Sequence, residues 1–203
     1  MDNNITKTLV IPAYTVSSVL ETMACRCALS HRKQVDQIII TEDGGFYSEK
    51  LKEVADIYIY NKKNAGFTKN LNKGWKLSTS NFTILANSDT LLVEGNLDDL
   101  CKNPPMVCSP KIINSIKTNN GFTGSYFVVP EEIRQRFGLL DERLKTFQSD
   151  IQYYNKIKAH FIREKRVSVF HYKSQSIIQS GLDSKKELTR DSNIYNQLKK
   201  QSP

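Results

Sequence analysis

Phe82–Thr90 (FTILANSDT) joins an apolar run to a polar tripeptide, and this junction points to the fold class. Phe82–Ala86 has the length and composition of a buried strand, which Asn87-Ser88-Asp89 ends abruptly. A carboxylate at a strand tip lies where ligands bind in an open α/β sheet, and it is a good ligand for a divalent cation. Asn, Ser and Asp also favour turns, so a plain turn after the strand is the simpler alternative.

The chain before this junction alternates between apolar strands and helical segments. Continuously apolar strands joined by short helical connections predict a mostly parallel sheet that is covered by helices on both faces. We expect strands at residues 8–12, 35–41, 56–60 and 82–86, and helices at about 16–27, 48–54 and 67–78. In the first helix, with Ser17 or Thr15 as N-cap, the spacing predicts an inward stripe of Val16, Val19, Leu20, Met23 and Cys27.

Beyond Leu92 the alternation becomes less regular, which predicts a smaller antiparallel region beside the parallel sheet. Strands are expected at residues 106–110, 125–129 and 166–171, and helices at about 131–137, 147–158 and 187–200. We therefore expect one α/β domain at residues 1–176 and a helical tail at residues 177–203. Within the domain, a first half at about 1–95 and a second half at about 96–176 are expected to form two sides of one site.

Composition fits an ordinary globular protein of 203 residues with a formal charge of +8. No apolar stretch approaches the ~20 residues that span a bilayer, and the N-terminus lacks the pattern of a signal peptide, so we expect a cytoplasmic protein. The four cysteines lack zinc-binding spacing. A basic surface attracts nucleotide phosphates, acidic membranes or nucleic acid, so peripheral membrane contact is compatible with the charge. The simpler alternative is a solvated basic face.

Short polar segments follow the ends of several predicted elements, where parallel strands bring them to one edge of the sheet. Their order and spacing resemble those of family 2 glycosyltransferases with the GT-A fold, and the rhamnosyltransferase-like members in particular. The resemblance covers about Thr8 to Ser176 and implies transfer of a sugar from a nucleotide-sugar donor to a glycan or lipid-linked glycan. The resembling segments are Val10–Tyr14 (VIPAY), Ile39–Gly44 (IITEDG), Asn64–Phe67 (NAGF), Asn72–Gly74 (NKG), Asn87–Thr90 (NSDT), Gly138–Leu144 (GLLDERL), Phe147–Asp150 (FQSD), and His171 with Ser174 and Ser176.

On the donor side, the resemblance implies a divalent cation that stabilises the charge of the leaving diphosphate. It implies Asp89 as one ligand and His171 as a second, and an imidazole ligand favours Mn²⁺ over Mg²⁺. For His171, a hydrogen-bonded histidine at a strand end is the alternative. The resemblance further implies nucleotide contacts, with Glu42 and Asp43 on the base and ribose. The full set of implied nucleotide-binding residues is Pro12, Tyr14, Glu42, Asp43, Asn64, Gly66, Asn72, Asn87 and Ser88.

On the acceptor side, transfer requires a base to take the proton of the attacking hydroxyl. By resemblance we assign this role to Asp150; capping of the predicted helix is the alternative. Members of the family usually carry an acidic residue where this chain has Ser149. A single displacement from the face opposite the leaving group predicts an inverting enzyme. Asp141 and Glu142 are expected near the acceptor, with capping of the next segment as the alternative.

Three other functions compete with this interpretation. The neutral residues Asn87 and Ser149 also fit a module that binds a nucleotide sugar without catalysis. The +8 charge alone would fit a nucleic-acid-binding protein, but no such motif is present and we expect no nucleic-acid partner. A nucleotidyltransferase would also use a strand-end carboxylate and a metal. It would usually carry a glycine-rich N-terminal segment with a basic residue, which this chain lacks.

Overall fold

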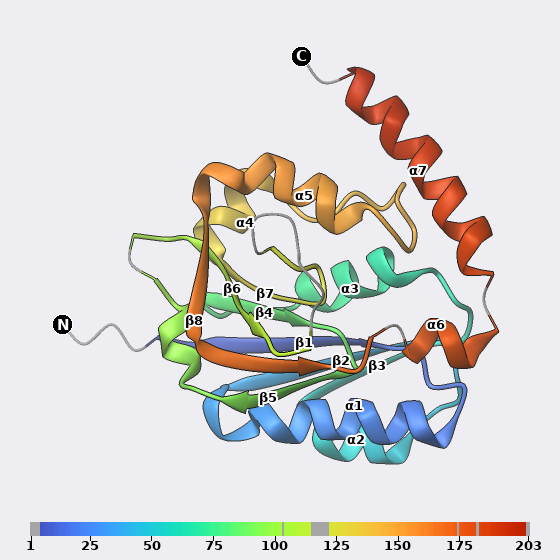
Figure 1. The fold of residues 1–203 in the computed structure, drawn as a ribbon. Coiled ribbons are helices and arrows are strands. Elements are labelled where there is room, and N and C mark those ends of the chain that lie inside the picture. Colours follow the sequence, from blue (N-terminus) through green and yellow to red (C-terminus); the bar gives the residue numbers. More distant parts are fainter. Residues whose placement is uncertain (1–4, 103, 115–121, 174, 182, 202–203) are drawn as a thin grey trace.

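The computed structural model describes residues 5–102, 104–114, 122–173, 175–181 and 183–201, and these form a mixed α/β fold (Figure 1). The described strands make one eight-stranded sheet in the order β3-β2-β1-β4-β7-β6-β8-β5. They are β1 (Lys7–Ala13), β2 (Gln37–Asp43), β3 (Ile57–Asn61), β4 (Phe82–Ala86), β5 (Thr90–Glu94), β6 (Val107–Ile112), β7 (Tyr126–Pro130) and β8 (Phe161–His171).

Helices lie on both faces of this sheet, as the sequence predicts (Figure 1). The α-helices are α1 (Ser18–His31), α2 (Glu49–Val54), α3 (Phe67–Trp75), α4 (Glu131–Phe137), α5 (Ser149–Ile157), α6 (Gln175–Ser180) and α7 (Ser184–Gln201). Short 3₁₀ turns are η1 (Arg32–Gln34), η2 (Leu97–Leu100) and η4 (Lys158–His160).

The first four strands are parallel to one another and their side chains divide the core into two layers. Side chains alternate between the faces of a strand, and in β1 Leu9 and Ile11 join the cluster under α1 and α2. Val10, between them, joins the opposite cluster with Trp75 of α3 and Tyr153 of α5. Both faces of β1, β2 and β4 are therefore buried, which explains their long apolar runs, whereas the edge strand β3 is half-buried.

The second half of the sheet is mixed. β7 pairs antiparallel with β4 and β6, β8 runs parallel to β6, and β5 pairs antiparallel with β8. Only Asn87–Asp89 separates β4 from β5, yet β5 lies at the far edge of the sheet. Four strand spacings would span ~19 Å in a flat sheet, whereas the four residue steps from Ala86 to Thr90 reach at most ~14 Å. The sheet must therefore curl.

Several expectations need correction at the level of single elements. Val16 and Val19 are exposed, because α1 begins at Ser18 and turns Leu20, Ala24 and Cys27 inward. Ser17 is the N-cap, accepting a hydrogen bond from the Leu20 amide. Two elements, β5 and α6, had no counterpart among the expected elements, and β8 begins five residues earlier than expected. Within the described part of the chain, no helix is both long and apolar enough to cross a bilayer.

Candidate active site

A cavity of about 480 Å³ opens at the carboxyl ends of β1, β2 and β4. Because these strands are parallel, their ends share one edge of the sheet, and residues far apart in sequence meet there. The cavity lining includes most of the residues singled out from the sequence. These are Pro12, Tyr14, Asp43, Asn64, Gly66, Asn87, Ser88, Asp89, Asp150 and His171.

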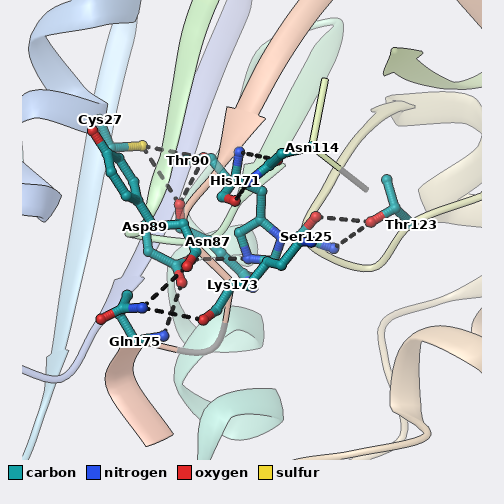
Figure 2. Close-up of polar contacts among 11 residues, drawn as sticks. Cys27, Asn87, Asp89, Thr90, Asn114, Thr123, Ser125, His171, Lys173 and Gln175 are labelled. Carbon is teal, nitrogen blue, oxygen red and sulfur yellow. Dashed lines mark hydrogen bonds and ion pairs between the residues drawn. The ribbon is translucent and has the colours of Figure 1, made fainter. Parts of the chain in front are cut away.

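Asp89 and His171, the two metal-ligand candidates, face each other across this cavity edge (Figure 2). Pairing of β5 with β8 sets Thr90 opposite His171, which brings the imidazole beside the neighbouring carboxylate. His171 Nε2 lies 3.2 Å from Asp89 Oδ1. The backbone of His171 is fixed by Asn114, whose side chain bonds both its N–H and its carbonyl.

The Asp89 and His171 side chains fit a divalent cation. His171 Nε2 is buried and, among the described residues, has no partner in hydrogen-bond geometry, although a carboxylate oxygen is close to it. Adjacent ligands of an octahedral ion with bonds of about 2.1 Å lie roughly 3 Å apart, close to the observed separation. The described residues hold no group of three or more His, Cys, Asp or Glu side chains suited to a metal. The remaining ligands would therefore come from donor oxygens and water.

Asp43 lines the cavity and holds the neighbouring loop. Its two carboxylate oxygens accept hydrogen bonds of 2.9 Å from the amides of Ala65 and Gly66. Burial raises the pKa of Asp43, while these amides oppose the rise. Gly66 has φ of +98°, and a Cβ there would lie 2.2 Å from Cγ of Lys145. Glycine is thus required for this loop to bring its backbone to the cavity.

Glu42 does not line the cavity, contrary to the nucleotide contact expected of it. Side chains alternate along β2, so Glu42 points away from the face of Asp43. Its carboxylate is fully buried and accepts hydrogen bonds from Thr15 N–H at 3.0 Å, Thr15 Oγ1 at 2.6 Å and Gly45 N–H at 2.9 Å. Glu42 therefore holds the loop after β1 through Thr15, and it thereby positions the neighbouring Tyr14, which lines the cavity.

Asn72, Asp141 and Glu142 likewise lie outside the cavity lining. Asn72 is buried and holds the segment after α4, donating to Leu140 O at 2.8 Å and accepting from Leu140 N at 3.2 Å. It also donates to Glu142 Oε1, which Lys76 approaches at 3.5 Å. Asp141 pairs with Arg143, which lowers the pKa of this carboxyl. The structure thus shows these three side chains engaged in contacts within the protein.

Asp150 sits in the first turn of α5 and lines the cavity. Burial raises the pKa of its carboxyl group, with the Ile151 amide opposing. Gly124, on the loop before β7, makes room for it, because a Cβ at that position would lie 2.0 Å from Asp150 Oδ2. Asp150 is therefore a half-buried carboxylate at the cavity wall, packed against the backbone of Gly124.

Other lining residues were given no role from the sequence, although four of them lie in segments that carry the resemblance: Ala13, Phe67, Phe147 and Gln148. They come from the end of β1, from the loops before β7 and α5, from α3 and α5, and from α7, and all but Ala13 lack the strand-end pattern that drew attention to the others. They include Ala13, Phe67, Asn70, Thr123, Gly124, Ser125, Thr146, Phe147, Gln148, Ile151 and Leu188. In the structure, Gln148 has a left-handed backbone conformation with φ of +66° just before α5. Ser174 and the side chain of Ser176 lie outside the described residues.

Cys27 of α1 packs directly behind the turn that carries Asp89. Its Sγ lies 3.6 Å from both the Asn87 carbonyl and Thr90 Oγ1 (Figure 2). Thr90 Oγ1 also donates to the Asn87 carbonyl at 2.7 Å, and the Asn87 amide donates to Ser125 O at 2.8 Å. The turn is thereby held from two sides, which fixes the direction of the Asp89 side chain.

Comparison with solved structures gives the same fold at low sequence identity. TarS 1-349 from S. aureus aligns with a TM-score of 0.64 and 11% identity, covering 82% of this chain and 60% of that one. TarS 1-349 in complex with UDP gives a TM-score of 0.62 and 12% identity, with the same coverage. Mannosyltransferase PcManGT from Pyrobaculum calidifontis, in complex with GDP-Man and Mn²⁺, gives 0.60 and 13%, covering 83% and 57%.

The sequence comparisons place the chain in a family. The chain spans about 60% of the length of the TarS structures, and a search of curated proteins returned no match. The model of the family described as glycosyl transferase family 2 matches residues 8–162, which include β1 except its first residue, β2 to β7, and the cavity residues up to Ile151. This chain belongs to glycosyl transferase family 2.

Proposed function

We propose that this chain is a metal-dependent, inverting glycosyltransferase that moves a sugar from a nucleotide-sugar donor to a hydroxyl of a glycan acceptor. One observation carries the proposal: a single cavity brings together the Asp89–His171 pair and the half-buried carboxylate of Asp150. The Asp89–His171 pair suits the diphosphate end of a donor, and Asp150 suits removal of a proton from an acceptor.

On the donor side, Asp89 and His171 would hold a divalent cation, with Mn²⁺ favoured by the imidazole ligand. The cation, when bound, would act as a Lewis acid on the departing diphosphate. Gly66 brings the backbone before α3 close to the cavity, and Asp43 fixes that backbone through two amides. Pro12 and Tyr14 border the same space from the end of β1.

On the acceptor side, Asp150 would take the hydroxyl proton as the acceptor oxygen bonds to the anomeric carbon. The bond from that carbon to the diphosphate oxygen breaks in the same step, so the nucleoside diphosphate leaves and the configuration inverts. A raised pKa makes a carboxylate a stronger base, and burial raises the pKa of Asp150. This role does not require the acidic neighbour that Ser149 replaces.

Substrate identity is proposed at the level of chemical class. UDP-, GDP- and dTDP-linked hexoses or deoxyhexoses are the candidate donors, and the structures with UDP and with GDP-Man support testing the first two. A glycan or lipid-linked glycan is the proposed acceptor, in a cytoplasmic pathway that builds a polysaccharide.

A binding screen followed by turnover tests the proposal. Thermal shifts are measured with UDP-, GDP- and dTDP-sugars, each with and without Mn²⁺, and the stabilising donor is then assayed for transfer and hydrolysis. We expect stabilisation that requires the metal, because ligands that bind the folded state raise its Tm. The wild type is expected to transfer the sugar with inversion at the anomeric carbon. Metal-dependent binding with neither transfer nor donor hydrolysis would instead identify a binding module.

A further inference from the structure

Helix α7 lies beside the loop that leads into α5 (Figure 1). Its Leu188 contributes to the wall of the cavity. One face of the helix makes these contacts, because its contacting residues recur at helical spacing. Leu188 lines the cavity, while four polar side chains bind the loop or α5. The polar side chains are Glu187, Asp191, Ser192 and Tyr195.

Asp191 makes the principal contact of this face. It is fully buried, and its carboxylate accepts hydrogen bonds from three consecutive backbone amides. The donors are Lys145 N at 3.2 Å, Thr146 N at 2.8 Å and Phe147 N at 2.7 Å. Arg190 adds contacts at 2.7 and 3.0 Å. Burial alone would raise the pKa of Asp191, but the amides and Arg190 outweigh it and lower that pKa.

The loop held by Asp191 touches both sides of the candidate site. On the donor side, the Lys145 carbonyl accepts from the Thr68 amide at 3.1 Å, and the Lys145 side chain packs over Gly66. On the acceptor side, the loop continues through Thr146–Gln148, all of which line the cavity, to Asp150. A carboxylate on three successive amides fixes the path of this loop more tightly than one hydrogen bond would.

We propose that Asp191 is a positioning residue, through which α7 sets the loop at 145–148 and with it the placement of Asp150. This inference rests on the proposed function, since it concerns the group that removes the acceptor proton. It makes the C-terminal helix part of the working site, on the acceptor side, although the helix lies beyond the segment matched to the family. Loss of the Asp191 carboxylate would free the three loop amides and so displace the loop and Asp150. Asp89 and His171 would keep their own contacts.

Asp191→Asn tests this inference in the full chain. The amide is close in size and keeps one acceptor oxygen, but it removes the charge and one acceptor position. We expect kcat for transfer to fall by about tenfold to a hundredfold, because small misplacements of catalytic groups carry costs of that order. The Kd of UDP or GDP with Mn²⁺ is expected to change by a smaller factor than kcat, because Asp89 and His171 keep their own contacts and only the Lys145 end of the loop packs against the donor side at Gly66.

Hydrogen–deuterium exchange supplies a second readout that does not depend on turnover. The amides of Lys145, Thr146 and Phe147 are expected to exchange faster in the variant, while the amides of β1 and β4 do not change. Tyr195→Phe is the matched control, because it removes a contact of 2.8 Å between α7 and Asn155 on the same interface without touching the loop. It is expected to leave both kcat and the loop amides unchanged.

Three results would overturn the inference. These are unchanged loop amides, loosened amides with unchanged kcat, and a loss of kcat that Tyr195→Phe reproduces. If Asp191→Asn fails to fold, Asp191→Glu takes its place, since it keeps the charge but shifts the carboxylate by one methylene relative to the amides of Lys145, Thr146 and Phe147. It is expected to lower kcat in the same direction by a smaller factor, and an unchanged kcat would again overturn the inference. Absence of turnover in the wild type would count against the proposed function, whereas a normal wild type with a normal variant counts against Asp191 alone.

Discussion

His171 Nε2 lies 3.2 Å from Asp89 Oδ1, although 82 positions separate the two residues in the chain. The antiparallel pairing of β5 with β8 produces this closeness, by setting Thr90 opposite His171. The Asp89 carboxylate also accepts a hydrogen bond of 3.2 Å from the Gln175 amide, which begins α6. Asp89 is thus contacted by two consecutive elements, β8 and α6. Substitutions of Asp89 and His171 distinguish a metal-binding role of these side chains from a structural role.

Asp89→Asn is expected to abolish the dependence of nucleotide binding on metal and to lower transfer about a hundredfold or more, because a charged ligand is lost. Titration calorimetry of UDP and GDP, each with and without Mn²⁺, measures the first effect. Asp141→Asn serves as the control for the loss of one carboxylate outside the cavity, and its metal-dependent binding is expected to match the wild type. Equal binding enhancement by Mn²⁺ in Asp89→Asn and the wild type would exclude Asp89 as a ligand.

His171→Gln is expected to change which metal is preferred. Replacing imidazole by an amide oxygen favours Mg²⁺ relative to Mn²⁺, since Mg²⁺ takes mainly oxygen ligands. The ratio of nucleotide affinities with the two metals is the measurement. His160→Gln, near Phe137 and outside the cavity, is the control. A ratio that does not move would indicate that His171 is only a hydrogen-bonding residue at the end of β8.

Asp150→Asn is expected to lower transfer by about a hundredfold to ten-thousandfold while nucleotide affinity is retained, because only the proton acceptor is lost. The same change should raise Tm at pH 7. Burial raises the pKa of Asp150 in the folded state, so ionisation at neutral pH costs folding free energy that the amide does not incur. This gain in Tm should vanish once the pH falls below the ordinary pKa of an aspartate. Tm scans of both proteins from pH 3 to pH 8 test the sign, and a gain that grows on acidification would contradict it.

Gly124→Ala is expected to act through Asp150. Its Cβ would lie 2.0 Å from Asp150 Oδ2, so the carboxylate must move. Transfer should fall while metal-dependent nucleotide binding is kept. In a double-mutant cycle, Gly124→Ala should cost far less transfer in the Asp150→Asn background than in the wild type. Equal losses in the two backgrounds would mean that Gly124 matters for another reason.

Asn72→Ala is expected to destabilise the fold rather than weaken nucleotide binding. It leaves the Leu140 amide and carbonyl without their partner, at a cost of about 1–3 kcal/mol in the free energy of unfolding. Urea unfolding measures that cost, with the exposed Asn193→Ala as control. A normal free energy of unfolding with a weakened nucleotide Kd would restore the direct contact that the sequence resemblance implies.

The sequence predicts the first half of this fold well, because β1, β2 and β4 are buried on both faces and so carry long apolar runs. β4 is found at Phe82–Ala86, the range expected from sequence. β5 was not among the expected strands although Leu91, Leu92 and Val93 are apolar, and in the structure only Thr90 of this edge strand is fully buried. α6 was missed as well, being a single short element in a polar region.

The candidate site was predictable where strand ends determine it and not where strand faces do. Glu42 and Asp43 are adjacent carboxylates at the end of β2, but neighbouring side chains point to opposite faces, so only Asp43 faces the cavity. No local pattern in the sequence reveals which of the two carboxylates faces the cavity, because Glu42 is held on the other face by Thr15, 27 positions away. Asp191 was equally invisible, because a single aspartate in a polar tail reads as a solvated charge until its three amide donors are known.

Cys27 gives this site an internal reporter of opening. Its thiol is completely buried behind Asn87 and Thr90, and burial raises its pKa to about 12. Alkylating reagents attack the thiolate, so the intact molecule protects Cys27 both by exclusion and by proton affinity. The rate of Cys27 alkylation therefore reports how often α1 separates from the turn that carries Asp89.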